Sequence, residues 1–423
     1  MRRSDLPSFE RREAPDEAHD AVRALRQAGY IRRFGSGRYA FTPIGERVHR
    51  RITERVRQGM RAIGAQPVSL PQLQSRALWE RSERWGAWDG EMFTLEDRTG
   101  RQLCLAPSHE EGAVKLLEGV VRSYDDLPVV VYQIGRKHRD DHARKGLLRA
   151  KEFSMKDAYS FHADVGSLEE WYDRMRRAYR EIFADLGLEV CTARAENTVM
   201  GGSHSEEFVA PVDDGTLELL ACTNEACEVG ITDEQARWDE FDEGDDCPGC
   251  EGRLRRSAGV EVGHIFRLGD RYAEAMDLTV DGDDGTSQTV LMGSYGIGIT
   301  RVLQTLLQQQ DLDGGCRWPV TARGTVAPFQ ASIIPLRYDG VYRDVARRLY
   351  DRLGPEEILL FDGAERTIGE RFAVSDRLGI PRKLVIGTEY EATGKIEVET
   401  RAGETSHVDP ASIETALPEL LGE

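Results

Sequence analysis

The spacing of apolar residues along the chain predicts two long helices. The first is expected from Ile44 to Gly64, because apolar side chains recur there every three or four residues, the period of one helix face. Those positions are Ile44, Val48, Ile52, Val56, Met60 and Ile63. Gly64 is expected to end this helix, since glycine readily takes the left-handed conformation of a helix terminus.

The second helix is predicted from Leu168 to Leu186. Its apolar face is formed by Leu168, Trp171, Met175, Tyr179, Ile182 and Leu186. Ser167 and Glu170 have the spacing of a capping box, which places the start of the helix beside them.

Extended segments are predicted around and beyond these helices. Residues 67–74, "PVSLPQLQ", are expected to be extended because Pro71 biases the preceding residue toward the β region. Runs at 128–134 and 150–162 are typical of strands. Past residue 325 the pattern alternates between strand and helix, at 329–336, 342–354, 357–361, 370–379 and 382–387. Such alternation predicts a small α/β domain with a largely parallel sheet.

The length and the start of the chain restrict its class. With 423 residues the chain has room for about two or three domains. No apolar run is long enough to cross a bilayer, and the opening "MRRSDLPSFERRE" lacks the apolar stretch of a signal peptide. A cytoplasmic protein without a membrane partner is therefore expected.

The charge is strongly acidic. The chain has 56 basic and 74 acidic residues, a net charge of -18, and only 7 of the basic residues are lysine. A nucleic-acid partner would need a local basic patch on such a surface. Adaptation to a high-salt cytoplasm and GC-rich codon usage both fit this composition.

Four of the seven cysteines form two close pairs. Cys222-x4-Cys227 and Cys247-x2-Cys250 are separated by nineteen residues. Two such pairs can close a tetrahedral site of four thiolates, which favours zinc. Because all four ligands come from the protein, this zinc is expected to be structural and not catalytic.

A strand, loop and strand at 132–162 carry a cluster of basic side chains. They are Arg136, Lys137, Arg139, Arg144, Lys145 and Arg149. Arginines on the inner face of a hairpin would offer forked donors to a phosphate. A solvated basic loop explains the same composition.

Two further segments have candidate chemistry. In "CLAPSHEEGAV" (104–114) the metalloprotease motif H-E-x-x-H fails because position 113 is alanine, while Ser108 could cap a helix. In "MGSYGIGITR" (292–301) the glycines do not match a dinucleotide fold or a P-loop. They allow either a close approach to an anion held by Arg301 or a tight turn.

Taken together, these segments resemble the class II aminoacyl-tRNA synthetases. "IGAQPVSLPQLQ" resembles motif 1, Arg139 in "RKHRDD" the motif 2 arginine, and "GSYGIGITR" motif 3. Within that class, "AGYIRRFGSGRYAFTPIGERV", "LAPSHEE", "EFSMKDAYSFH", "GGSHSEEF", "GVEVGHIFRLG", "YAEAM" and "VAPFQ" look like the bacterial-type prolyl-tRNA synthetases, in order and over nearly the whole chain.

The resemblance implies a fold and a reaction. The fold would be α+β, with a catalytic domain at 1–325 built on an antiparallel sheet flanked by helices, and an α/β anticodon-binding domain at 326–423. The four-cysteine module at 216–256 would be a small zinc-ribbon-like insertion. The implied reaction uses ATP and Mg²⁺ to activate L-proline and transfers it to tRNA(Pro), in a homodimer without a DNA partner. A paralogue for another amino acid or acceptor, and a silent regulatory or RNA-binding protein, are the alternatives.

The resemblance also implies residue roles. Arg139 would hold the α-phosphate of ATP beside the proline carboxylate, and Arg301 the γ-phosphate. The other implied ATP-binding residues are Asp141, Arg149, Phe153, which would stack on adenine, and Glu261, which would contact ATP or magnesium. The other implied proline-binding residues are Ser108, Glu110, whose carboxylate would meet the proline ammonium, His264 and Phe266. For His264 and Phe266, ordinary core packing is an equal alternative.

Several positions depart from the family pattern. Asp141 replaces glutamate, Ser108 replaces threonine, Ser294 replaces cysteine, and Glu206 replaces histidine in "SHEF", which puts proline selectivity in question. The long editing domain of many relatives is missing, so removal of mischarged alanine would need a separate protein. In the carboxy-terminal domain the charged positions at 361–381 are shifted, and Arg366, Arg371 and Arg377 are candidates for RNA contact.

Overall fold

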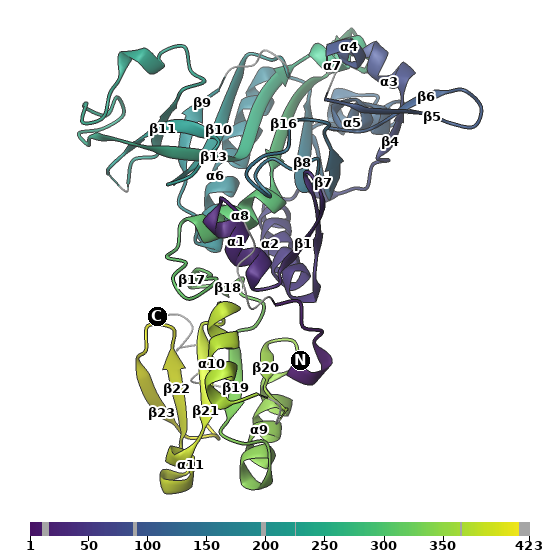
Figure 1. The fold of residues 1–423 in the computed structure, drawn as a ribbon. Helices are drawn as coiled ribbons and strands as arrows, with labels where there is room; N and C mark the ends of the chain where they lie inside the picture. The colour runs from purple at the N-terminus through teal and green to yellow at the C-terminus, as the bar shows by residue number, and fades with distance from the viewer. Residues whose placement is uncertain (11–16, 88–90, 196–199, 225, 364–365, 414–423) are drawn as a thin grey trace.

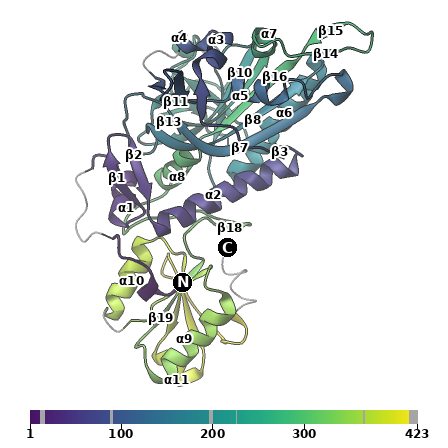
Figure 2. The same cartoon turned by 90° about the vertical axis from the view of Figure 1, so that its right-hand side faces the viewer.

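The computed structural model describes residues 1–423 except 11–16, 88–90, 196–199, 225, 364–365 and 414–423. Figure 1 shows two lobes, one built on a nine-stranded sheet and the other on a five-stranded sheet. Helices α1 (Asp20–Gln27), α2 (Pro43–Ala62) and α8 (Ile299–Gln308) lie between them. The view in Figure 2 shows α2 running along the underside of the larger lobe.

The larger sheet carries the candidate site. Its strands, in spatial order, are β10 (His204–Val212), β9 (Cys191–Arg194), β12 (Val229–Thr232), β11 (Leu217–Cys222), β13 (Leu254–Gly269), β16 (Leu291–Ile297), β8 (Glu152–His162), β7 (Val129–His138) and β3 (Gln66–Pro67). Neighbours pair antiparallel except β3 with β7 and β12 with β9. The predicted strands at 128–134 and 150–162 are the hairpin β7–β8.

The first predicted helix is confirmed as α2. Thr42 caps its start by accepting a hydrogen bond from the Gly45 amide, and Pro43 occupies the first turn. The predicted apolar positions are buried except Ile63, which is partly buried against the same core. Gly64 follows with φ of +83°, as expected of a helix terminus.

The second predicted helix is confirmed as α6 (Val165–Leu186), but its predicted cap is wrong. The cap is Asp164, whose carboxylate accepts a hydrogen bond from the Ser167 amide. Ser167 lies inside the first turn, and its hydroxyl contacts His162 Nδ1 at 2.8 Å. A carboxylate three residues earlier satisfies the free amide and complements the helix dipole, so the helix begins sooner than the Ser167–Glu170 spacing indicated.

The smaller lobe is a mixed α/β domain. Its sheet has the order β20 (Ile358–Leu360), β19 (Ala331–Pro335), β21 (Arg382–Ile386), β22 (Ile396–Thr400) and β23 (Thr405–Val408), with helices α9 (Gly340–Leu353), α10 (Ile368–Arg377) and α11 (Thr388–Thr393). The five predicted elements are present. The prediction of a largely parallel sheet is only half right, because β22 and β23 extend the three parallel strands as antiparallel neighbours.

The remaining elements surround the larger sheet or connect the lobes. They are η1 (Arg3–Asp5), β1 (Ile31–Gly35), β2 (Arg38–Phe41), β4 (Leu73–Ser75), α3 (Arg76–Arg81), α4 (Arg84–Ala87), β5 (Phe93–Glu96), β6 (Gln102–Leu105), α5 (Glu110–Leu117), η2 (Tyr124–Asp126), η3 (Trp238–Glu240), α7 (Arg271–Ala275), β14 (Thr279–Asp281), β15 (Ser287–Thr289), β17 (Val320–Thr321) and β18 (Gly324–Thr325).

A continuous apolar core and specific hydrogen bonds join the two lobes. The core includes residues from α2, α6 and α8 and from the start of the smaller lobe. Tyr30 donates its hydroxyl proton to the Leu378 carbonyl at 2.5 Å and accepts a bond from Trp318 Nε1 at 3.1 Å. Across the described part of the chain, none of the helices combines the length and the apolar character needed to span a membrane.

Candidate active site

The ten residues predicted to bind ATP or proline line one cavity of about 400 Å³. They are Ser108, Glu110, Arg139, Asp141, Arg149, Phe153, Glu261, His264, Phe266 and Arg301. These residues come from segments up to 193 positions apart, and the large sheet brings them together because β8, β13 and β16 are adjacent in it. The cavity has a size suited to small-molecule substrates.

The two predicted catalytic arginines enter the cavity from different elements. Arg139 follows β7, and its guanidinium lies 5.5 Å from the centre of the Phe153 ring. Arg301 lies in the first turn of α8 and donates from Nε to the Leu148 carbonyl at 3.1 Å and from Nη1 to the Glu261 carboxylate at 2.6 Å. Burial and the nearby Arg301 lower the pKa of Arg139. Two cations that share a cavity create a favourable site for a polyanion.

The glycines before Arg301 do not form a loop. Gly293 and Gly296 lie within strand β16, and α8 starts directly after Gly298. The tight-turn interpretation is therefore wrong for Gly293 and Gly296, and only Gly298 joins the strand to the helix. The close approach to an anion held by Arg301 stays a prediction. Gly296 and Gly298 line the cavity, where they leave space that a side chain would occupy. At Gly293 a Cβ atom would lie 2.0 Å from the Tyr295 hydroxyl, so close packing explains that glycine.

Glu110 lies at the buried end of the cavity. Its side chain accepts hydrogen bonds from the hydroxyls of Ser108, at 2.5 Å, and Ser294, at 3.0 Å. Helix α5 begins at Glu110, and the residue at its cap position is His109. The prediction that Ser108 caps this helix is wrong, because the Ser108 hydroxyl is engaged by the glutamate two residues later.

Arg84 is a functional candidate that sequence reasoning missed. It is fully buried and donates to Glu110 at 3.0 Å, to Glu111 at 3.0 Å and to the Ser108 hydroxyl at 2.9 Å. Burial alone would raise the pKa of Glu110, but Arg84 and the Ser108 hydroxyl outweigh it and keep that pKa below its usual value. Glu110 is therefore ionised at neutral pH. An isolated arginine in the charged stretch "ERSERWG" has no signal that distinguishes it from a surface residue.

His264 and Phe266 are neighbouring wall residues of the cavity. Their rings stack with centroids 3.8 Å apart, and both side chains line the cavity. His264 Nδ1 lies 3.1 Å from Glu261 and 3.4 Å from Glu207. Each of these three residues has a ligand atom within 4.8 Å of the others, so the group could hold a metal ion.

Glu207 is a second residue that the sequence did not single out. Burial and the neighbouring Glu261 raise the pKa of Glu207 to about 9. Burial alone would raise the pKa of Glu261, but Arg301 and His264 outweigh it and hold that pKa well below the usual range. The pair thus combines one protonated and one ionised carboxyl group.

Glu206, which was expected to affect proline selectivity, points away from the cavity. Alternate residues of β10 face opposite sides of the sheet, and Glu206 accepts from the Tyr172 hydroxyl at 3.1 Å and pairs with Arg176 of α6 at 3.2 Å. Its neighbour Glu207 is the residue that faces His264. The expected effect of Glu206 on the proline pocket is therefore wrong.

The basic side chains of residues 132–162 lie in different environments. Arg139 and Arg149 line the cavity, and Arg149 forms an ion pair with Asp141. Lys137 is buried 2.8 Å from Asp157, while Arg136 pairs with Glu152 and Lys145 with Asp214. The solvated-loop interpretation therefore does not apply to Lys137, Arg139 or Arg149.

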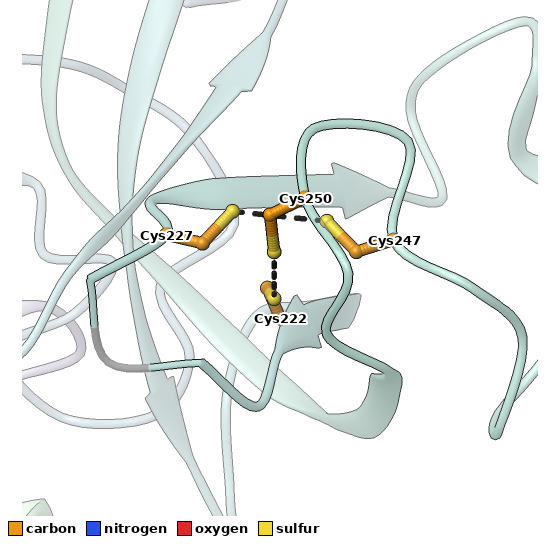
Figure 3. Close-up of side chains that lie close together, drawn as sticks. All are labelled: Cys222, Cys227, Cys247 and Cys250. Atoms are coloured by element: carbon orange, nitrogen blue, oxygen red, sulfur yellow. Dashed lines mark hydrogen bonds between the residues drawn. The ribbon is translucent and has the colours of Figure 1, made fainter.

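The four cysteines of the two sequence pairs lie together at one end of the large sheet. Figure 3 shows their sulfur atoms directed toward one another. Cys222 Sγ lies 3.5 Å from Cys250 Sγ, and Cys227 Sγ lies 3.7 Å from Cys247 Sγ. All four ligand atoms lie within 4.8 Å of one another. This donor set has the chemistry and size of a zinc site.

The arginines proposed for RNA contact in the smaller lobe differ in exposure. Arg371 is 3% exposed and donates to the carbonyls of Pro335, at 2.6 Å, and Gly363, at 2.8 Å. Its assignment to RNA contact is wrong, because these bonds hold the domain together. Arg366 and Arg377 both lie near Glu10, at 3.5 and 3.8 Å, and stay partly exposed.

Comparison with known proteins agrees with this geometry. Residues 93–310 match the tRNA synthetase class II core domain (G, H, P, S and T), and residues 330–420 match the anticodon binding domain. A proline–tRNA ligase of Acidiphilium cryptum is 35% identical over 99% of this chain and 99% of its own length. The chain belongs to the proline–tRNA ligase family. A further family member, from Rhodospirillum rubrum, is 36% identical over 99% of this chain and 98% of its own length.

The same fold occurs in solved structures of prolyl-tRNA synthetase. The enzyme from Cryptosporidium parvum complexed with L-proline and AMP superposes with a TM-score of 0.74, covering 95% of this chain and 74% of that chain at 16% identity. Its complex with halofuginone and AMPPNP gives 0.75. All ten predicted cavity residues of this chain lie in the matched synthetase core. The full-length match to short relatives also shows that it carries no large insertion.

Proposed function

We propose that this protein forms prolyl-adenylate from L-proline and ATP in the cavity described above and then transfers proline to tRNA(Pro). The observation that carries the proposal is the convergence of Arg139 and Arg301 on a cavity that also holds the ionised Glu110. A polyanion and a cationic amino acid can thus be bound side by side.

Glu110 would bind the secondary ammonium group of proline. Arg84, Ser108 and Ser294 hold its carboxylate in place, so the acceptor is oriented before the substrate arrives. His264 and Phe266 would form the wall beside the pyrrolidine ring. Discrimination against alanine by such a wall is weak, since each missing methylene is worth only about 1–3 kcal/mol.

The guanidinium groups would stabilise the activation step. A carboxylate oxygen of proline attacks the α-phosphorus of ATP, the new P–O bond forms, and the bond to the bridging oxygen of pyrophosphate breaks. Arg139 would bind the α-phosphate, and Arg301 would bind the γ-phosphate. Nε and Nη1 of Arg301 are held by Leu148 and Glu261, which fixes the guanidinium plane. Preorganised cations of this kind stabilise charge as it develops. Phe153, Asp141 and Arg149 would contact the adenosine end.

The side of the cavity next to Arg301, called the nucleotide side below, also has two carboxyl groups that suit Mg²⁺. The ionised Glu261 offers oxygen ligands, which Mg²⁺ prefers. Glu207, whose ligand atom lies within 4.8 Å of that of Glu261, would release its proton on binding the ion. Mg²⁺ bound with ATP would neutralise phosphate charge. The four cysteines would hold a structural Zn²⁺, because four thiolates complete its tetrahedral coordination.

The other partners follow from the family. Residues 1–325 would form the catalytic unit, including the four-cysteine segment at 216–256, and residues 326–423 would bind the anticodon end of tRNA(Pro). Motif 1 would contribute to a homodimer interface. We expect the enzyme to act in the cytoplasm.

Pyrophosphate exchange with each amino acid, followed by charging of total tRNA, tests the proposal. Proline-dependent exchange together with charging is expected from the purified chain. Exchange without charging would favour a paralogue with another acceptor, exchange with a different amino acid would overturn the assignment to proline, and silence in both assays would favour a regulatory protein. Arg301→Ala should abolish exchange, whereas Arg323→Ala, an exposed arginine of the β17–β18 hairpin, should not.

A further inference from the structure

The four-cysteine cluster is connected to the nucleotide side of the cavity by two strands. Strand β12 starts two residues after Cys227 and ends two residues before Glu234, which lines the cavity. Strand β13 starts four residues after Cys250 and carries Glu261 into the cavity. Both strands pair with β11 in the large sheet.

The four sulfur atoms of the cluster are spaced as in a tetrahedral metal site. Zn–S bonds of about 2.3 Å in a tetrahedron place neighbouring sulfur atoms about 3.8 Å apart, and two of the separations here are 3.5 and 3.7 Å. Backbone amides two residues further on donate to three of the sulfur atoms, from Asn224 to Cys222, Gly249 to Cys247 and Gly252 to Cys250. Such bonds stabilise the thiolate form that binds a metal.

Apolar packing around the cluster is thin. The buried residues of the apolar cluster around the cysteines are Leu220, Ile231, Cys247 and Leu254, with Val229, Trp238 and Phe241 partly buried against them. So small a core offers little hydrophobic stabilisation, whereas a structural Zn²⁺ supplies on the order of 10 kcal/mol of folding free energy. Zn²⁺ would therefore supply most of the stabilisation of the two cysteine turns and of the strand ends next to them.

Glu234 is the cavity residue most directly attached to this module. It follows β12 in a turn that is bonded to β11: the Asp233 amide donates to the Glu218 carbonyl at 3.2 Å, and the Glu218 amide donates to the Asp233 carboxylate at 3.0 Å. Glu234 itself is exposed at the mouth of the cavity. Glu234 and Glu261 line the same cavity, and partial burial together with the charge of Glu261 raises the pKa of Glu234.

Glu110, at the proline end of the cavity, has no such attachment, and the wall residues His264 and Phe266 lie in the part of β13 that pairs with β10 and β16 and not with β11. Glu110 is held by Arg84, Ser108 and Ser294, and none of these residues belongs to segment 216–256. Disorder of the cysteine module would therefore displace groups on the nucleotide side and leave the Glu110 pocket in place.

We propose that Zn²⁺ bound by the four cysteines positions Glu234 at the cavity mouth, so that the metal controls the affinity for Mg·ATP and not the affinity for proline. The identity of the nucleotide rests on the proposed function. The zinc site is thus a positioning device for substrate binding as well as a structural element.

The test measures zinc content, the Kd of Mg·ATP by calorimetry and the KM of proline by pyrophosphate exchange in the full chain. Cys250→Ser should lose zinc and weaken Mg·ATP about 5- to 10-fold, the size of a typical coupling between two sites, with the proline KM changed less than about twofold. Cys250→His restores a zinc ligand and should recover both zinc and Mg·ATP affinity. Glu234→Gln should keep zinc and weaken Mg·ATP, and adding Cys250→Ser to it should weaken binding little further.

Two variants outside the proposed zinc and nucleotide sites serve as controls. Cys316→Ala removes a buried thiol outside the cluster, and Glu240→Gln removes an exposed carboxylate of the same segment; both should leave zinc and Mg·ATP binding unchanged. The inference is overturned if the purified chain holds no zinc, if zinc loss leaves the Mg·ATP Kd unchanged, if Glu234→Gln has no effect, or if proline and ATP binding weaken equally. Failure of the proposed function is a separate result, namely no proline-dependent exchange by the unmodified chain.

Discussion

Replacing Arg84 by methionine should damage proline binding selectively. The substitution keeps most of the side-chain volume but removes the guanidinium that bonds both Glu110 and Glu111 in a fully buried site. Burial raises the pKa of Glu110, and Arg84 provides the largest effect that lowers it. Without Arg84 the pKa of Glu110 should therefore rise. Glu110 should become protonated near neutral pH and lose its attraction for the proline ammonium.

The expected magnitude follows from the lost interaction. A hydrogen bond to a charged group contributes about 1.5–3 kcal/mol, so the KM of proline should rise about 10- to 150-fold. The KM of ATP should stay within about threefold, because Arg84 does not line the nucleotide side. Removal of one partner from a buried ion pair also costs about 3–5 kcal/mol of stability, so the melting temperature should fall.

The assay is pyrophosphate exchange at varied proline and pH, with thermal unfolding measured in parallel. A carboxyl group is ionised above its pKa, so the proline KM of Arg84→Met should improve as pH rises from 6 to 9, whereas that of the unmodified enzyme should vary little. Arg81→Met, which breaks a partly exposed pair with Glu118, is the control and should change stability by less than about 1 kcal/mol. A proline KM within twofold of the unmodified value, or an equal rise in both KM values, would refute the role of Arg84.

Three further predictions concern residues whose environment the structure revealed. Glu206→Gln should leave the proline KM within twofold, since this carboxylate pairs with Arg176 on the opposite face of the sheet; a tenfold rise measured by exchange would contradict that placement. Glu207 has a pKa raised to about 9, so its contribution to stability is complete below the ordinary carboxyl pKa and is lost as pH rises toward 9. Glu207→Gln cannot ionise, and its melting temperature relative to the unmodified enzyme should therefore increase between pH 5 and 9; a constant difference would count against the shift. Arg371→Ala should cost about 2–4 kcal/mol in chemical unfolding of the smaller lobe, because two backbone carbonyls lose their donor, whereas Arg366→Ala should have less than a quarter of this effect.

The helices and strands were accessible from the sequence because they depend on local periodicity. The apolar face of α2 recurs at the helical period and is buried throughout, and the alternating elements beyond residue 325 appear in the predicted order. The four cysteines were found for a similar reason, since each pair is closed by a short local turn. The ten cavity residues depended instead on resemblance to a family, because no local pattern links Glu110 to Arg301.

Long-range packing decided the remaining features. Whether Glu206 or Glu207 lies on the His264 side of the sheet depends on the registry of β10 against β13, and a shift of one residue exchanges the two faces. The ionisation of Glu110 depends on Arg84, which stands 26 positions earlier and shows no periodicity that marks it. Arg371 carries the charge of an RNA-binding residue in the sequence, and only its burial against Pro335 and Gly363 shows that it stabilises the fold. The role of a charged side chain depends on its distance from other groups and on how far it is removed from water. Both are set by the packing of the whole chain.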